Sequence, residues 1–201
     1  MVEQTDADTA GQRLEAELRA YVSANDRLRS AGMFDPELGV GSPEALAIEL
    51  DWMHQLALRY QRVYALLLVD FDDYASYQAQ YGRRAARLAH KLMAEHVRHG
   101  CRAADRLYRL DEGTALVVLL PETRLEGACV LGRRLVEGFR ARGIPHLRSE
   151  SRLLTLSAAA AAAEGETPPP EPRALLEEAR LYLRVAQARG GANLASRLEA
   201  A

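Results

Sequence analysis

Acidic side chains follow a short apolar run at residues 64–69, which the sequence predicts to be a buried strand. Asp70, Asp72 and Asp73 would then lie at the carboxyl end of that strand. Carboxylate oxygens are ligands that Mg²⁺ prefers, so a divalent-cation site is one interpretation. Two carboxylates without a third protein ligand bind Mg²⁺ weakly, and the alternative is that Asp70 and Asp72 accept hydrogen bonds from loops and helix ends. We favour that alternative, so the sequence predicts no metal site.

A second group that could do chemistry is Arg102 with Asp105, an RxxD tetrapeptide that follows a predicted helix and precedes a predicted strand. A guanidinium grips phosphate oxygens in a fixed fork or stacks on a planar ring, and a carboxylate accepts hydrogen bonds. Arg106 and Arg109 add positive charge nearby. RxxD is also a common tetrapeptide, and the alternative is a surface ion pair at a helix end, which would stabilise the protein little.

The sequence predicts helices and strands that position these groups. Apolar periodicity predicts helices at 12–29, 43–57, 83–99, 125–140 and 173–188, and strands at 64–70, 106–110, 115–120 and 152–159. Residues 111–114 join two of the strands as a hairpin, with Gly113 in the turn. Residues 31–42 and 164–172 are rich in Gly or Pro and predict loops. The order predicts an α+β fold, with a central, mainly antiparallel sheet flanked by helices and an N-terminal helix before it.

Length and charge limit the classes of function. A chain of 201 residues suggests one domain with short appendages: a disordered leader at 1–11, an N-terminal helix at 12–31 and a domain at 32–198. The helix could form a short coiled coil or pack on its own domain. A net charge of -2 predicts no general attraction to nucleic acid, and the apolar runs are too short for membrane insertion. Two cysteines without a metal or disulfide pattern, and no signal peptide, predict a cytoplasmic protein.

Five segments in this order resemble the GGDEF domains of diguanylate cyclases. They are LLLVDFDDY at 66–74, Tyr81-Gly82, VVLLPET at 117–123, LTLS at 154–157 and the helix at 174–193. The resemblance covers about residues 35–193 and implies the nucleotidyl cyclase-like fold of that family.

The catalytic hairpin of the family does not match. The resemblance implies a Gly-Gly-Asp/Glu-Glu-Phe signature, in which the acids hold metal or serve catalysis between two GTP molecules. If the hairpin is aligned on Pro121, its places fall on 112–116, and if it is aligned on Arg109 they fall on 111–115. Both acids are absent in either alignment.

Other places of the family's nucleotide site have also changed. The guanine-binding Asn and Asp correspond to Gln78 and Arg87, and the phosphate-binding Lys and the Arg after it correspond to Gln187 and Gly191. The sequence therefore predicts a degenerate GGDEF-like domain that is not an enzyme. Residual cyclase activity is a third hypothesis, which these losses oppose.

The RxxD motif stands where the family has its inhibitory site, which binds the product cyclic di-GMP. The resemblance implies ligand contacts from Arg102 and Asp105, with a further Arg from the next helix at Arg134. The predicted ligand-binding residues are therefore Arg102, Asp105, Arg134, Arg109 and Arg133. The predicted function is a non-catalytic cyclic di-GMP receptor, without cofactor or metal, that signals to an unidentified protein partner as a homodimer or a ligand-bridged dimer. The alternative is a ligand-independent interaction scaffold.

Overall fold

The computed structural model describes residues 32–164 and 171–198. The predicted leader at 1–11 and the predicted helix at 12–31 lie outside the described residues. No helix in the described ranges combines the length and the apolar composition needed to cross a membrane.

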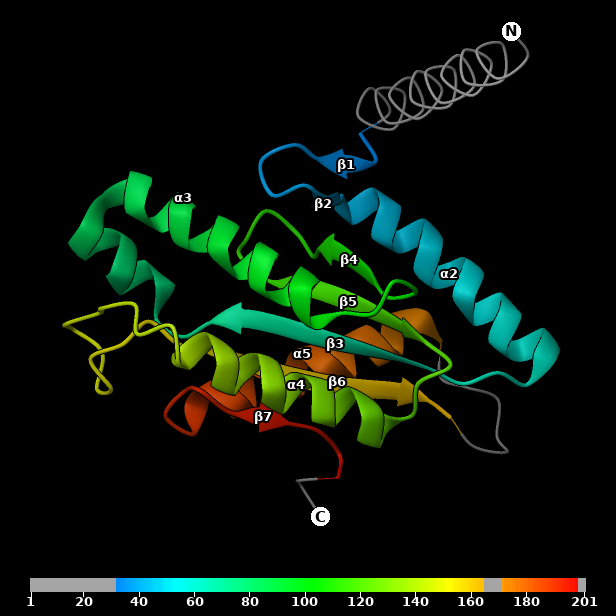
Figure 1. Cartoon of the computed structure of the whole chain (residues 1–201). Coiled ribbons are helices and arrows are strands. Elements are labelled where there is room, and N and C mark those ends of the chain that lie inside the picture. The colour runs from blue at the N-terminus through cyan, green and yellow to red at the C-terminus, as the bar shows by residue number, and fades with distance from the viewer. Residues whose placement is uncertain (1–31, 165–170, 199–201) are drawn as a thin grey trace, which may run out of the picture.

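One seven-stranded sheet organises the described residues, in the order β1-β2-β4-β5-β3-β6-β7 (Figure 1). The central strands β4, β5, β3 and β6 pair with one another in antiparallel fashion, while β2 pairs with β4 and β7 pairs with β6 in parallel. This confirms the predicted α+β class with a mainly antiparallel sheet. The strands are β1 Phe34–Asp35, β2 Val40–Gly41, β3 Tyr64–Phe71, β4 Arg106–Arg109, β5 Leu116–Pro121, β6 Leu156–Ala163 and β7 Leu194–Ala195.

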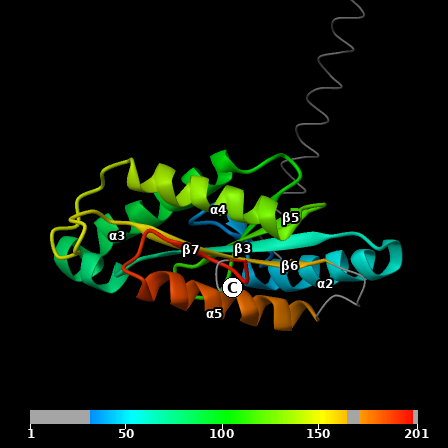
Figure 2. The ribbon, with the colours of Figure 1, turned by 90° about the horizontal axis from the view of Figure 1, so that it is seen from below.

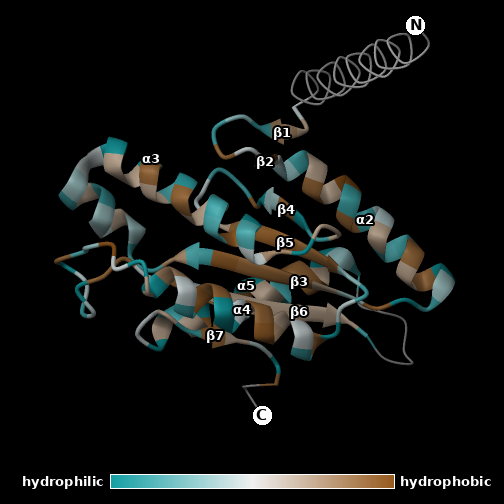
Figure 3. Cartoon of the chain, in the orientation of Figure 1, coloured by the Kyte–Doolittle hydropathy of each residue, from teal (hydrophilic) through white to brown (hydrophobic). Residues whose placement is uncertain are grey.

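Two layers of helices enclose the sheet, as Figure 2 shows: α3 and α4 on one face, α2 and α5 on the other. Along β3, Leu67 and Val69 enter the core beneath α3 and α4, whereas Leu66 and Leu68 enter the core beneath α2 and α5. Burial on both faces explains why β3 is a continuous apolar run (Figure 3). The helices are α2 Pro43–Tyr60, α3 Tyr74–Gly100, α4 Leu125–Arg140 and α5 Pro172–Ala188.

The alanine run at 158–163 is itself a strand. The sequence predicted a strand at 152–159, but β6 begins at Leu156 and continues to Ala163, with every residue buried. Alanine favours helices in isolated chains, and here tertiary context overrides that preference. β6 pairs with β3 along its whole length, and α4 and α5 pack on its two faces. Small side chains on both faces let the two helices approach the sheet closely.

Two predicted loop and helix boundaries differ in the structure. The region predicted as a loop at 31–42 contains the short strands β1 and β2, which add an edge to the sheet. The helix predicted to follow Gly82 is present, but α3 as a whole begins at Tyr74, because a shorter helical arm precedes Gly82. Gly82 itself is non-helical, with φ 82° and ψ 166°, and it divides α3 into two arms. Glycine adopts this positive φ without a steric penalty. The start of α2 was predicted correctly, since Ser42 Oγ accepts a hydrogen bond from Ala45 N at 3.2 Å.

Replacing Ala160 with Leu should destabilise the protein by about 1–3 kcal/mol, because the larger side chain has no room between β6 and the helix above it. Ala160 is 0% exposed. Urea unfolding followed by circular dichroism measures the change. Ala188→Leu, at the exposed last residue of α5, is the matched control and should change stability little. Equal unfolding free energies for the two variants would contradict this account of β6.

Candidate functional site

The RxxD segment forms a tight turn between α3 and β4. Arg102 N donates a hydrogen bond to Asp105 Oδ2 at 2.7 Å, and Asp105 N donates to the Arg102 carbonyl oxygen at 3.1 Å. These reciprocal bonds fix the Asp105 carboxylate against the backbone of the turn. The Asp105 Oδ1 atom makes no hydrogen bond within the described ranges, so it can accept one from outside.

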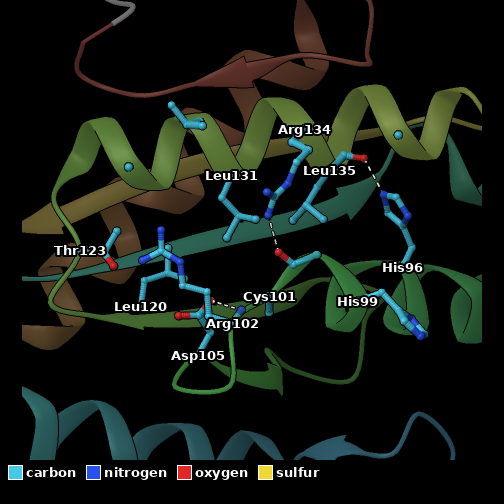
Figure 4. A pocket seen from close by; sticks show the side chains of 14 residues that line it. His96, His99, Cys101, Arg102, Asp105, Leu120, Thr123, Leu131, Arg134 and Leu135 are labelled. Atoms are coloured by element: carbon cyan, nitrogen blue, oxygen red, sulfur yellow. Dashed lines mark hydrogen bonds between the residues drawn. The ribbon is translucent and has the colours of Figure 1, made fainter.

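A pocket of about 680 Å³ lies between this turn, the end of α3 and one side of α4. Arg134 reaches into it from α4 and donates through Nη2 to the carbonyl oxygen of Gly100, the last residue of α3. Figure 4 shows Arg102 and Arg134 on opposite walls of the pocket. The structure thus brings Arg102, Asp105 and Arg134 together around one cavity.

The side of α4 that faces the pocket is a single helical stripe. Gly127, Leu131, Arg134 and Gly138 lie at spacings of four, three and four residues and all line the cavity. The sequence predicted Arg134 and Arg133 on this helix, but not the other residues of the stripe or the bond from Arg134 to the Gly100 carbonyl oxygen. The stripe was a detectable signal, because two glycines on one face of an amphipathic helix allow neighbouring groups to approach closely. A Cβ atom at Gly138 would lie only 3.0 Å from His96 Cε1.

The remaining walls of the pocket are mostly neutral. Burial raises the pKa of the Cys101 thiol to about 11, so it stays protonated at neutral pH. Burial also lowers the pKa of His96, whose Nε2 donates to the Leu135 carbonyl oxygen at 2.8 Å. Arg102 and Arg134 are the arginines that line this pocket, together with the Asp105 carboxylate.

Arg109 and Arg133, also predicted as ligand contacts, do not line this pocket. The guanidinium of Arg109 donates to Asp35 Oδ2 at 2.8 Å and to the carbonyl oxygens of Glu112 and Gly113. It therefore ties the β4–β5 hairpin to the edge strand β1. Arg133 is exposed on α4, one position before Arg134, and so points in another direction around the helix.

The hairpin at 110–115 forms hydrogen bonds with other parts of the domain. Leu110 N donates to the Ala115 carbonyl oxygen, so residues 111–114 form the loop. Thr114 Oγ1 donates a short hydrogen bond to Asp70 Oδ1, and His90 Nε2 donates to the Thr114 carbonyl oxygen at 3.0 Å. Burial raises the pKa of Asp70 above its usual range, although the bonds from Thr114 and from Phe71 N oppose the rise.

Asp72 joins three segments through hydrogen bonds. Its Oδ1 accepts from Ser157 Oγ at 2.7 Å, and its Oδ2 accepts from Thr155 Oγ1 at 2.7 Å and from Ala192 N at 2.8 Å. Gly191 packs against this carboxylate so closely that a Cβ atom there would lie 2.7 Å from Asp72 Cγ. Gln187 Nε2 donates to the Phe71 carbonyl oxygen at 3.0 Å.

The arrangement around Asp70 and Asp72 does not fit a magnesium site. Mg²⁺ needs several oxygen ligands that face one point, and here the protein's own donors occupy one oxygen of Asp70 and both oxygens of Asp72. Within the described ranges, no group of three or more His, Cys, Asp and Glu side chains gathers where it could hold a metal ion.

Comparison with known proteins gives a consistent picture. The family model for the diguanylate cyclase GGDEF domain matches residues 39–193. Diguanylate cyclase DgcP of Pseudomonas aeruginosa is 32% identical over 150 residues, which cover 72% of this chain and 21% of that protein. The chain therefore spans about a fifth of the length of this curated relative.

Solved structures share the fold at low sequence identity. The coiled coil and GGDEF domain of DgcB from Caulobacter crescentus, in complex with c-di-GMP, gives a TM-score of 0.74 at 17% identity, over 91% of this chain and 98% of that chain. Diguanylate cyclase SiaD from Pseudomonas aeruginosa, in complex with its activator SiaC, gives a TM-score of 0.69 at 18% identity, over 96% of this chain and 73% of that chain.

Replacing Asp70 with Asn should raise the melting temperature at neutral pH. Because the pKa of Asp70 is raised in the folded state, its ionisation costs stability as the pH rises above the ordinary aspartate range. Asn keeps an oxygen for the Thr114 hydroxyl but carries no charge. The gain should shrink as the pH falls and vanish below the ordinary aspartate pKa of about 3.9. Thermal unfolding of both proteins between acid and neutral pH measures the difference, and a gain that grows at low pH would contradict the assigned direction.

Proposed function

The chain belongs to the diguanylate cyclase GGDEF domain family, and from this premise we propose that it is a non-catalytic receptor for cyclic di-GMP. The dinucleotide binds in the pocket of Arg102, Asp105 and Arg134. The observation that carries the proposal is that these residues, separated in sequence and predicted together, surround one cavity.

The chemistry of the pocket suits this ligand. Cyclic di-GMP carries two phosphates and two guanines, and each guanidinium can grip a phosphate or the edge of a guanine. Asp105 Oδ1 is available to accept from the N–H groups of a guanine. Since Arg102 and Arg134 approach from different walls, one ligand can contact both.

The turn is organised before any ligand arrives. The two hydrogen bonds between Arg102 and Asp105 hold the carboxylate in place, so ligand binding loses no conformational entropy by ordering the loop. Arg134 must exchange or share its bond to the Gly100 carbonyl oxygen. Ligand binding would thereby change the contact between α3 and α4, which a protein partner can sense. A ligand shared by two copies would bridge them as a dimer.

The proposed loss of catalysis rests on residues at the other end of the sheet, in the β4–β5 hairpin. The family joins two GTP molecules with metal-held phosphates, and phosphoryl transfer of this kind depends on metal ions and fixed positive charge. Here Thr114 and Ala115 stand at places of the two acids, and Thr114 uses its hydroxyl to bond Asp70. Losing several charged contacts at about 1.5–3 kcal/mol each would remove turnover.

One observation favours the alternative of a ligand-independent interaction scaffold. Arg134 already has a backbone partner in Gly100, so the pocket needs no anion to satisfy it. A binding measurement separates the two functions.

Isothermal titration of the full chain with cyclic di-GMP should show binding, and Arg102→Ala should weaken it roughly 10–100-fold, since a charge-assisted hydrogen bond is lost. Arg134→Ala should also weaken the binding of cyclic di-GMP. Arg133→Ala is the matched control, because its side chain does not line the pocket, and should leave the affinity unchanged. Absence of heat at high ligand concentration, or equal affinity for Arg102→Ala, would leave the scaffold as the better function.

Incubation of the chain with GTP and Mg²⁺ or Mn²⁺ should give no cyclic di-GMP by chromatography, for want of the two hairpin acids. Product that increases with protein concentration and disappears in Asp70→Asn would overturn the non-catalytic assignment.

A further inference from the structure

An apolar groove of about 760 Å³ runs between the N-terminal halves of α2 and α5. The groove is lined by α2 and α5, whereas the pocket of Arg102 is lined by α3 and α4. These two pairs of helices cover opposite faces of the sheet (Figure 2). The proposed receptor function makes no use of the groove. Leu50, Leu110 and Leu176 contribute to its floor and walls.

Two large apolar side chains stand at the groove and remain in solvent. Ile48 is 60% exposed and Trp52 is 57% exposed, one helical turn apart on α2. Trp52 is the only tryptophan of the chain. Neighbouring exposed side chains of this size, beside a concave apolar surface, are typical of a protein interface.

The two walls of the groove carry opposite charge. Asp51 lies on the α2 wall, and Arg173 and Arg180 lie on the α5 wall. Arg180 contacts Asp111 and Glu177. Asp51 and Arg173 are exposed and make no hydrogen bond or ion pair within the part of the chain that the structure describes.

We propose that this groove binds a second copy of the chain in a symmetric dimer, with the two-fold axis along the groove. That axis places the α2 wall of each copy against the α5 wall of the other. Ile48 and Trp52 of each copy then fill the groove of the other beside Leu176, and each Asp51 faces an Arg173. A surface that carries both a protrusion and a cavity, and both signs of charge, is self-complementary, as a two-fold interface requires.

The dimer does not depend on cyclic di-GMP, so its test is separate from that of the receptor. Sedimentation of the full chain between about 1 and 100 µM, without ligand, should show a monomer–dimer equilibrium. Over the same range, the fluorescence of Trp52 should shift to shorter wavelength as the side chain leaves water. The two curves should have the same midpoint.

Ile48→Gln should weaken the dimer at least about tenfold, as expected for an apolar side chain at the centre of an interface. Because Ile48 is exposed, the substitution should leave the fold intact. Leu181→Gln is the matched control: Leu181 is 52% exposed on α5 but does not line the groove. The Leu181→Gln variant should dimerise as strongly as the unchanged chain.

A charge exchange tests the orientation. Asp51→Arg and Arg173→Asp should each weaken the dimer, because like charges then face one another, and the double variant should restore it. Additive weakening in the double variant would overturn the proposed orientation. A monomer at every concentration would overturn the dimer itself, and so would Trp52 emission that is already at short wavelength in the monomer, since another segment of the chain would then cover the groove.

Discussion

The hydrogen bonds of two carboxylates at the end of β3 hold this end of the sheet together. Asp72 joins β3 to β6 and to the turn after α5, and Asp70 holds the β4–β5 hairpin through Thr114. Both carboxylates are partly buried, and such groups need partners, because an unpaired charge away from water is costly. Here the partners are hydroxyls and backbone N–H groups of the chain itself. The carboxyl end of β3 is therefore closed by internal contacts that also fix the relative positions of four strands.

The strand β4 connects that closed end with an open one. The hairpin follows Arg109 at one end of β4, and the RxxD turn precedes Arg106 at the other. The turn leaves a cavity beside α4, and its charged side chains face solvent, with Arg102 and one oxygen of Asp105 making no side-chain bonds within the described ranges. The molecule thus separates a rigid, self-satisfied end from an end whose polar groups can still accept a ligand, and the proposed receptor function uses only the second.

Much of this was predictable from local sequence, and the rest was not, for physical reasons. The order of elements, the buried strand at 64–69 and the cap at Ser42 follow from periodicity and turn chemistry, which are local. The RxxD turn and Arg134 were predicted to meet through a family resemblance, and they line one cavity. Arg109 was predicted to lie beside the RxxD turn, but it pairs with Asp35, and this contact could not be predicted because Asp35 is distant in sequence. The strand predicted at 152–159 is present, but its bounds were wrong, because six consecutive alanines carry no period and only burial between β3 and two helices makes them extended.

Gly191 limits which residues the turn after α5 can contain. The family resemblance places an arginine there, and here a side chain would collide with Asp72 at a backbone φ of +73°. A residue with a Cβ atom at this place must displace the carboxylate that joins β3 to β6. A charge introduced at position 191 would therefore weaken the end of the sheet before it could contribute to a nucleotide site, so the turn and the end of β3 can be redesigned only together.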